Sequence, residues 1–75
     1  MTAPLSNPRL PIVVNGQPRD IAVATTLAAL LQELAVPTRG VAVEINGQIV
    51  PRAKHAERCL STGDRLEIVS FVGGG

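Results

Sequence analysis

The residues most able to take part in a reaction are at the end of this 75-residue sequence, where Gly73, Gly74 and Gly75 follow an apolar stretch. Glycine lacks a Cβ and loses more conformational freedom on ordering than any other residue, so a run of three does not stabilise a fold. A narrow active site that admits a backbone and then a terminal carboxyl group would require such thin residues. Taken alone, the run is compatible with a frayed end and with a reactive arm.

The other reactive side chains do not form a catalytic set. Cys59 is the single cysteine; it could relay a persulfide, but no base or CxxC motif flanks it, and we expect a small, half-buried apolar side chain. His55 lies in a polar stretch without a second ligand and is expected on the solvated surface. Asp64 is expected to bond to the backbone of its own turn. Without a nucleophile, a base and oxyanion donors together, the sequence does not indicate an enzyme.

Composition excludes several classes of protein. With one Phe and no Trp or Tyr, the chain lacks the aromatic platforms that stack on nucleic-acid bases, and a net charge of +1 provides no basic stripe for phosphates. No Cys/His cluster has zinc spacing. No apolar run approaches the length of a membrane span, and the N-terminus has no signal-peptide core. We expect one small cytoplasmic domain with an aliphatic core and without nucleic-acid or membrane partners.

The first half of the chain predicts a hairpin followed by a helix. Asn15-Gly16 separates two strands, expected at residues 10–14 and 17–23, and this dipeptide is the strongest two-residue hairpin signal. Thr25 or Thr26 is expected to cap a helix. The helix is expected to end near Ala35, because Pro37 disfavours the helical conformation at the residue before it. Four leucines spaced i, i+3, i+4 and i+7 form its apolar stripe, which must lie on the sheet: Leu27, Leu30, Leu31 and Leu34.

The second half predicts a second hairpin and a closing strand. Asn46-Gly47 joins strands expected at residues 41–45 and 48–50, and residues 52–58 are polar enough for a single helical turn. Leu60 is expected in the core. The fifth strand is expected at residues 65–72, with Ser70 on its inner face. The order ββαβββ, with one helix on one face of a mixed sheet, predicts an α+β fold.

Two apolar residues of the fifth strand are expected on the face of the sheet that the helix does not cover. Val69 and Phe71 alternate with the inward Leu66 and Ile68, and a sheet covered by one helix leaves its other face to water. Aromatic residues are enriched in the buried centres of protein interfaces. We therefore predict that Val69 and Phe71 form a docking patch beside the glycine run.

This order of elements, with its glycine end, resembles the ubiquitin-like β-grasp fold. Within it, residues 45–52 (Ile-Asn-Gly-Gln-Ile-Val-Pro-Arg), residues 63–69 (Gly-Asp-Arg-Leu-Glu-Ile-Val) and Gly74-Gly75 are similar to the ThiS family, the bacterial sulfur carriers of thiamin-thiazole synthesis. The resemblance extends from about Leu10 to Gly75. It implies a flexible N-terminal extension over residues 1–9, a β-grasp domain over 10–72 and a flexible tail over 73–75.

The ThiS resemblance implies a protein carrier and not an enzyme. A partner similar to ubiquitin-activating enzymes (ThiF-like) would use ATP and magnesium to convert the Gly75 carboxylate to an acyl adenylate. A persulfide sulfur would then displace AMP to leave a thiocarboxylate, and thiazole synthase (ThiG-like) would take that sulfur into the thiazole ring. The carrier would hold no cofactor and would be a monomer when free.

The same resemblance assigns roles to residues. Gly75 would be adenylated and thiolated, and Gly73 and Gly74 would thread the partner's active site. Arg52, which matches the family's Val-Pro-Arg, would steer the partner or hold its own loop. The small subunit of molybdopterin synthase and the carriers for methionine or cysteine synthesis or transfer-RNA thiolation are alternatives in the same chemical class. A non-covalent β-grasp interaction module, with no terminal chemistry, is the alternative from another class.

Overall fold

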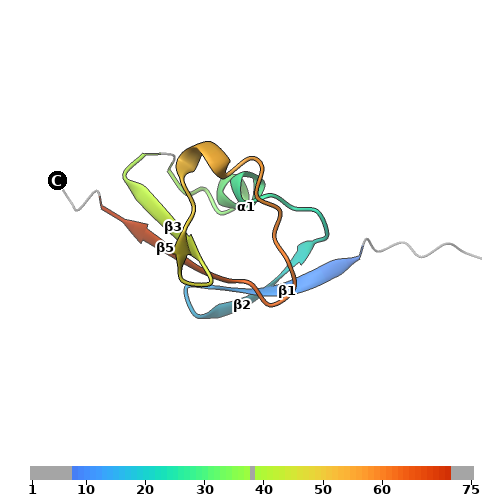
Figure 1. Cartoon of the computed structure of the whole chain (residues 1–75). Helices are drawn as coiled ribbons and strands as arrows, with labels where there is room; N and C mark the ends of the chain where they lie inside the picture. The colour runs from blue at the N-terminus through green and yellow to red at the C-terminus, as the bar shows by residue number, and fades with distance from the viewer. Residues whose placement is uncertain (1–7, 38, 72–75) are drawn as a thin grey trace, which may run out of the picture.

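The computed structural model of the chain describes residues 8–37 and 39–71. The described residues form a single mixed sheet with strand order β2-β1-β5-β3-β4, and the helix lies over one of its faces (Figure 1). Along the chain the elements are β1 (Arg9–Val14), β2 (Gln17–Ala22), α1 (Leu27–Glu33), β3 (Val41–Ile45), β4 (Gln48–Ile49), the short 3-10 helix η1 (Arg52–Lys54) and β5 (Arg65–Ser70). The predicted α+β order ββαβββ and the β-grasp arrangement are confirmed.

Both predicted Asn-Gly hairpins are present. Asn15 and Gly16 have φ angles of 49° and 81°, and Asn46 and Gly47 have φ angles of 54° and 85°. Positive φ at both central positions defines the type I′ turn, whose twist matches that of two antiparallel strands. The turns fix the register of β1 with β2 and of β3 with β4. Two short sequence signals thus determine four of the five strands.

Helix α1 has a capping motif at each end. The Thr26 hydroxyl accepts a hydrogen bond from the Ala29 amide at 3.1 Å, as an N-cap residue does. At the other end, Ala35 has a φ of 58°, and the Val36 amide donates to the Leu31 carbonyl. This Schellman-type ending closes the helix at Glu33, slightly earlier than the predicted end near Ala35.

The core lies between α1 and the sheet. Leu27 and Leu30, from the predicted leucine stripe, are fully buried, and Leu60 is buried as expected. Leu31 and Leu34 are only partly covered. Nine side chains make up the buried cluster: Leu10, Ile12, Ile21, Leu27, Leu30, Val43, Ile45, Leu60 and Leu66. Because a seven-residue helix is too short to be stable alone, this packing is what holds α1 in place.

Several element ends differ from the predictions. β1 begins at Arg9, which pairs with Ala22, and β4 ends at Ile49, short of the predicted residue 50. β5 ends at Ser70, which is exposed, although its pairing with Val41 places it on the helix side of the sheet, as predicted. The predicted end at Val72 lies outside the described residues. Within the described ranges, no helix combines the length and the apolar character that a bilayer span requires.

Candidate functional site

The candidate site is built on β5, the central strand of the sheet. β5 runs parallel to β1 and antiparallel to β3, and it is the last element before the glycine run. Leu66 is fully buried, which fixes the start of the strand in the core. Two groups of polar contacts reinforce that position.

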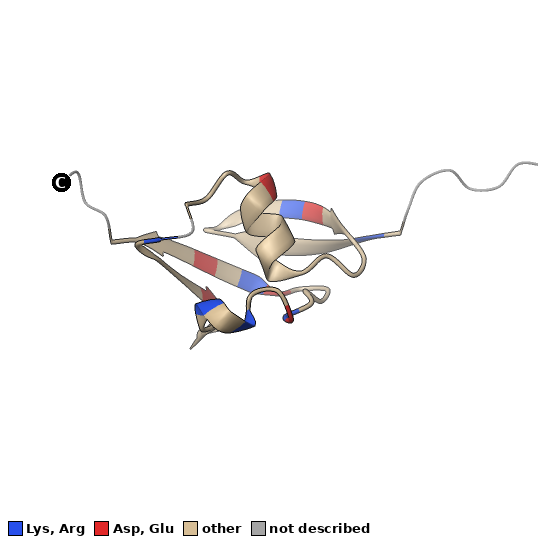
Figure 2. Cartoon of the chain, turned by 90° about the horizontal axis from the view of Figure 1, so that it is seen from above, with Lys and Arg blue, Asp and Glu red and all other residues tan. Residues whose placement is uncertain are grey.

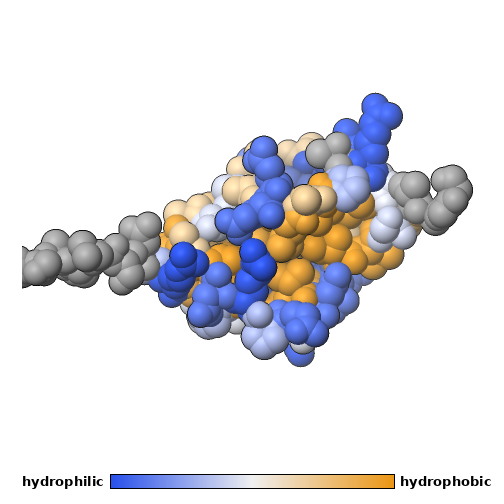
Figure 3. Space-filling view, turned by 180° about the vertical axis from the view of Figure 1, so that it is seen from behind, coloured by the Kyte–Doolittle hydropathy of each residue, from blue (hydrophilic) through white to orange (hydrophobic). Residues whose placement is uncertain are grey.

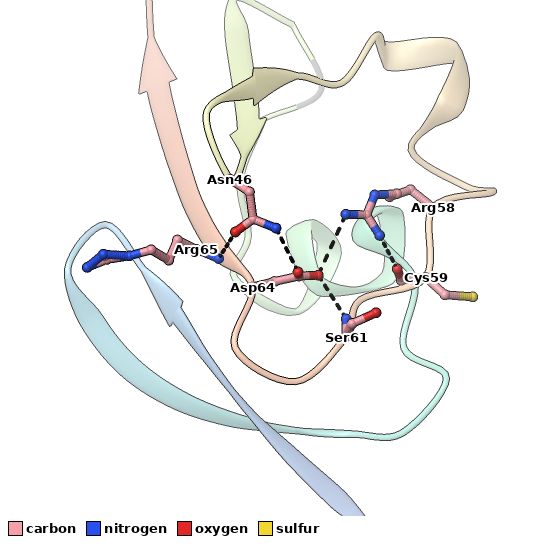
Figure 4. A network of polar contacts seen from close by, with 6 residues as sticks. All are labelled: Asn46, Arg58, Cys59, Ser61, Asp64 and Arg65. Carbon is pink, nitrogen blue, oxygen red and sulfur yellow. Dashed lines mark hydrogen bonds and ion pairs between the residues drawn. The ribbon is translucent and has the colours of Figure 1, made fainter.

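The first group surrounds Asp64, which is only 5% exposed (Figure 4). Its Oδ1 accepts a hydrogen bond from Asn46 Nδ2 at 3.0 Å, and its Oδ2 accepts one from the Ser61 amide at 2.8 Å. Arg58 lies 3.7 Å from the same carboxylate. The bond to Ser61 confirms the predicted turn role of Asp64. The contacts with Asn46 and Arg58 were not predicted; they join the turn before β5 to the β3–β4 hairpin and to the segment after η1.

The second group consists of the side chains of the two turn asparagines. Asn46 Oδ1 accepts a hydrogen bond from the Arg65 amide at 2.9 Å. Asn15 Oδ1 accepts one from the Ile68 amide at 2.7 Å, and Asn15 Nδ2 donates to the Ile68 carbonyl at 3.4 Å. In each hairpin, the asparagine that forms the turn therefore also hydrogen-bonds to the backbone of β5. Each Asn-Gly pair predicts its turn from the sequence, but it does not indicate that the asparagine side chain also bonds to β5.

The face of the sheet away from α1 carries an apolar strip. Val69 is 49% exposed and Phe71 is 67% exposed, as their alternation predicted. Ala42 lies opposite Val69 on β3, and Ile49, which is 66% exposed, lies opposite Glu44 and therefore on the same face. We call Ala42, Ile49, Val69 and Phe71 the outer strip. Sequence reasoning missed Ile49, although the two-residue turn at Asn46-Gly47 determines its face.

Two carboxylates lie beside the outer strip. Glu44 and Glu67 are directly opposite each other on β3 and β5. Like charges in directly opposite positions destabilise a sheet, so this pair contributes nothing favourable to the fold. Sequence reasoning missed it, because the pairing register of β3 with β5 was not deduced. A partner with basic residues around an apolar centre would complement this face.

The structure separates Arg52 from the other predicted docking residues. Arg52 is exposed in η1 and lines a groove beside α1, on the helix side of the sheet, whereas Val69 and Phe71 face the other side. The predicted contact of Arg52 with a partner stays a prediction. The predicted solvated position of His55 is wrong: the ring is partly buried and its Nε2 donates to the Val50 carbonyl at 3.0 Å.

Cys59 also differs from its expectation. It is exposed, not half-buried; its backbone pairs with Thr26, and the next residue, Leu60, is the one that is buried. Within residues 8–37 and 39–71, no three His, Cys, Asp or Glu side chains come together in a group that could hold a metal ion. The predicted site residues Gly73, Gly74 and Gly75 lie outside the described residues.

Comparison with known proteins agrees with this architecture. The model of the ThiS family matches residues 12–75. The chain is 34% identical over 64 residues to the sulfur carrier protein ThiS of Escherichia coli, a match that covers 85% of this chain and 97% of that protein. A crystal structure of the thiamine biosynthesis protein ThiS from Geobacter metallireducens superposes with a TM-score of 0.75 at 32% identity, covering 88% of this chain and 100% of that one.

Longer proteins match as well. A thiazole synthase of Paramagnetospirillum magneticum is 48% identical over 64 residues, which are 85% of this chain and 20% of that protein. The chain thus spans about a fifth of the length of the thiazole synthases that it matches. Fold and site together define a ubiquitin-like β-grasp domain. Within that class, the chain belongs to the ThiS family of sulfur carriers.

Proposed function

We propose that this chain is a sulfur carrier of thiamin biosynthesis that bears its sulfur on the carboxyl group of Gly75. The observation that carries the proposal is the extent of the family match, which runs from the core strand β1 through Gly75. The match therefore includes the glycine run itself. The proposal requires Gly75 to end the chain with a free carboxylate.

The chemistry begins with activation, because an α-carboxyl group, with a typical pKa of about 3.3 to 3.7, is a carboxylate at pH 7 and a poor electrophile. An adenylating partner joins the Gly75 carboxylate to the α-phosphate of ATP and releases pyrophosphate. A persulfide sulfur then attacks the acyl carbon and displaces AMP, which forms an acyl disulfide. A thiol cleaves the S–S bond, leaving the thiocarboxylate on Gly75 and a disulfide on the donor.

In this function the folded domain docks on the partner while the carboxyl group of Gly75 enters the active site. Three residues in an extended conformation would span about 10 Å, enough for the carboxyl group to enter a buried site while the domain stays outside it. The outer strip, with Val69 and Phe71 next to the glycine run, supplies the apolar centre of the contact with the partner. Glu44 and Glu67 favour a partner with basic residues at the rim.

Two kinds of partner follow from this function. One is a ThiF-like adenylating enzyme that uses ATP and magnesium, and the other is a ThiG-like thiazole synthase that receives the sulfur. The second is supported by the two thiazole synthases that contain a region similar to this chain. A persulfide protein supplies the sulfur. Because the activation consumes ATP, we place the carrier in the cytoplasm.

The direct test is the intact mass of the protein after incubation with an adenylating partner, MgATP and a persulfide donor. We expect a mass increase equal to the exchange of one oxygen for sulfur, and no increase when Gly75 is deleted. A chain that never gains mass with such partners, yet still binds them through its outer strip, would be a non-covalent interaction module and not a carrier.

The glycine run gives a second test of the same proposal. Replacing Gly74 with Leu adds a side chain where the partner's channel must be narrow, so we expect thiocarboxylate formation to fail while partner binding through the outer strip persists. A Leu5→Ala variant, changed near the other end of the chain, is the matched control and should be thiolated normally. Normal thiolation of the Gly74→Leu protein would contradict the proposed threading.

A further inference from the structure

A groove of about 530 Å³ lies on the helix side of the molecule, between α1, the start of β3 and the segment around η1. Figure 2 shows α1 and η1 flanking this side, with the basic residues of η1 in blue. The walls are largely aliphatic, with Leu31, Val36 and Val41 among the lining residues. This volume is within the range of pockets that bind ligands. We call it the α1–β3 groove.

The floor of the groove is an open strand edge. At the two ends of β3, the Gly40 carbonyl accepts a hydrogen bond from the Phe71 amide, and the Asn46 amide donates one to the Arg65 carbonyl. The bonds across to β5 therefore fall on the even-numbered residues, and Val41 and Val43 direct their N–H and C=O groups away from β5. The Val43 carbonyl accepts a hydrogen bond from the Val50 amide, but β4 pairs no further along β3 than Glu44. Among the described residues, no strand therefore pairs with Val41 on this side. Its N–H and C=O point into the region beside the groove.

The groove is lined by an arginine and by no acidic residue. The arginine is Arg52, and His55 also lines the groove. The opposite side of α1 is different, because Arg19 of β2 and Glu33 of α1 form an ion pair there, with 3.4 Å between Nη2 and Oε1. One flank of α1 therefore carries an ion pair with β2, and the other borders the apolar α1–β3 groove with Arg52 among its lining residues.

We propose that the α1–β3 groove binds an extended segment of a partner protein, which adds as a short strand to β3 at Val41. The exposed backbone edge favours a peptide over other apolar ligands, because it offers a donor and an acceptor at strand spacing. An aliphatic side chain of the segment packs on Leu31 and Val36, and an acidic side chain lies beside Arg52 and His55. The groove faces away from the outer strip, so both surfaces can be occupied at once.

The probe is an acetylated and amidated peptide, Asp-Val-Ile-Val-Asp, titrated into the ¹⁵N-labelled full-length chain. We expect saturable changes in the amide resonances of Val36, Val41 and Ala56, and none at Ile49 or Val69. A peptide methylated on its central backbone nitrogens, or one with Lys in place of Asp, should bind more weakly. Changes confined to the outer strip, or no saturation at millimolar peptide, would overturn the proposal.

Variants with matched controls exclude indirect effects. Ala56→Leu fills the groove and should abolish binding, whereas Ala53→Leu, at an exposed alanine that does not line the groove, should not. Arg52→Gln should weaken binding about two- to fivefold, as loss of an exposed charge pair does, and Lys54→Gln should leave it nearly unchanged. Urea unfolding of each variant verifies that it is folded. Equal affinity of the Ala56→Leu and Ala53→Leu proteins would overturn the proposal.

A second copy of this chain is the competing occupant. Sedimentation velocity across the concentration range used for the titration distinguishes it. If the chain dimerises, and Ala56→Leu restores the monomer without peptide, the groove is a self-association surface and the proposal of a partner segment is wrong. A monomer throughout, together with saturable peptide binding, supports the proposal.

Discussion

The two halves of β5 are held very differently. Arg65 and Leu66 pair with both β1 and β3, and the side chains of Asn46 and Asn15 bind the backbone at Arg65 and Ile68. Residues 69–71 have β3 on one side, while the parallel pairing with β1 reaches no further than Leu66. Correspondingly, Leu66 is fully buried and Phe71 is 67% exposed. The strand is anchored at its start and presents side chains and backbone at its end.

This contrast separates stability from recognition within one strand. A fold needs the first half, because the core side chains and the buried Asp64 network converge on it. The second half contributes little to the core and places Val69 and Phe71 beside the glycine run. The proposed carrier function uses this end, where a partner can cover the outer strip and reach the carboxyl group.

The largest effect is expected from Leu66→Ala, in the anchored half. Removing a fully buried leucine leaves a cavity and should lower the free energy of unfolding by about 2 to 5 kcal/mol. Val69→Ala, three residues later on the exposed face, should change it by less than about 0.5 kcal/mol. Urea denaturation measures both. Equal losses in the two variants would abolish the distinction between the halves.

A smaller loss is expected from Asp64→Ala. The substitution removes two hydrogen bonds to a buried carboxylate, those donated by Asn46 Nδ2 and the Ser61 amide, and should cost about 1 to 3 kcal/mol. Asp20→Ala, on the exposed strand β2, is the matched control and should cost little. If the two variants unfold at the same urea concentration, the network does not anchor β5.

Phe71→Ala tests the presenting half. Its free energy of unfolding should change by less than about 0.5 kcal/mol, since the ring is mostly exposed. The KM of the adenylating partner for the carrier should rise at least about fivefold, the effect expected for a central aromatic residue worth more than about 1 kcal/mol in an interface. Val23→Ala, an exposed valine away from the outer strip, is the control. An unchanged KM for Phe71→Ala would remove the outer strip from the docking surface.

The smallest effect is expected from Glu67→Gln. Relief of the repulsion with Glu44 should raise the free energy of unfolding by about 0.2 to 0.5 kcal/mol, and the gain should shrink in high salt. The same change should slow association with a basic partner surface, which stopped-flow fluorescence measures. A variant that is more stable and associates faster would show that the carboxylate pair has no role in docking.

Much of the fold could be predicted because its signals are local. The Asn-Gly turns require positive φ at two adjacent residues, and the leucine spacing of α1 indicates one buried face, so strand and helix positions follow from short windows. Period-two alternation likewise predicted that Val69 and Phe71 are exposed. Each of these predictions depends only on neighbours in the sequence.

The remainder depends on pairs that are distant along the chain. Asp64 meets Asn46 across 18 residues and Ile68 meets Asn15 across 53, and no local pattern indicates either contact. The early end of β5, the exposure of Ser70 and the open edge at Val41 all follow from where β1 and β4 stop pairing. For the same reason, the α1–β3 groove could not be predicted: its lining residues come from separate segments of the chain, and none of them alone indicates a binding site.

Amide hydrogen exchange at Ile68 and Ser70 tests the division of β5 most directly. Both N–H groups point toward the same side of the strand, but Ile68 donates to Asn15 Oδ1 at 2.7 Å, whereas the register gives Ser70 no acceptor among the described residues. We expect Ile68 to exchange only through global unfolding and Ser70 to exchange orders of magnitude faster through local exposure. Equal protection of the two amides would contradict an anchored first half and a presenting second half.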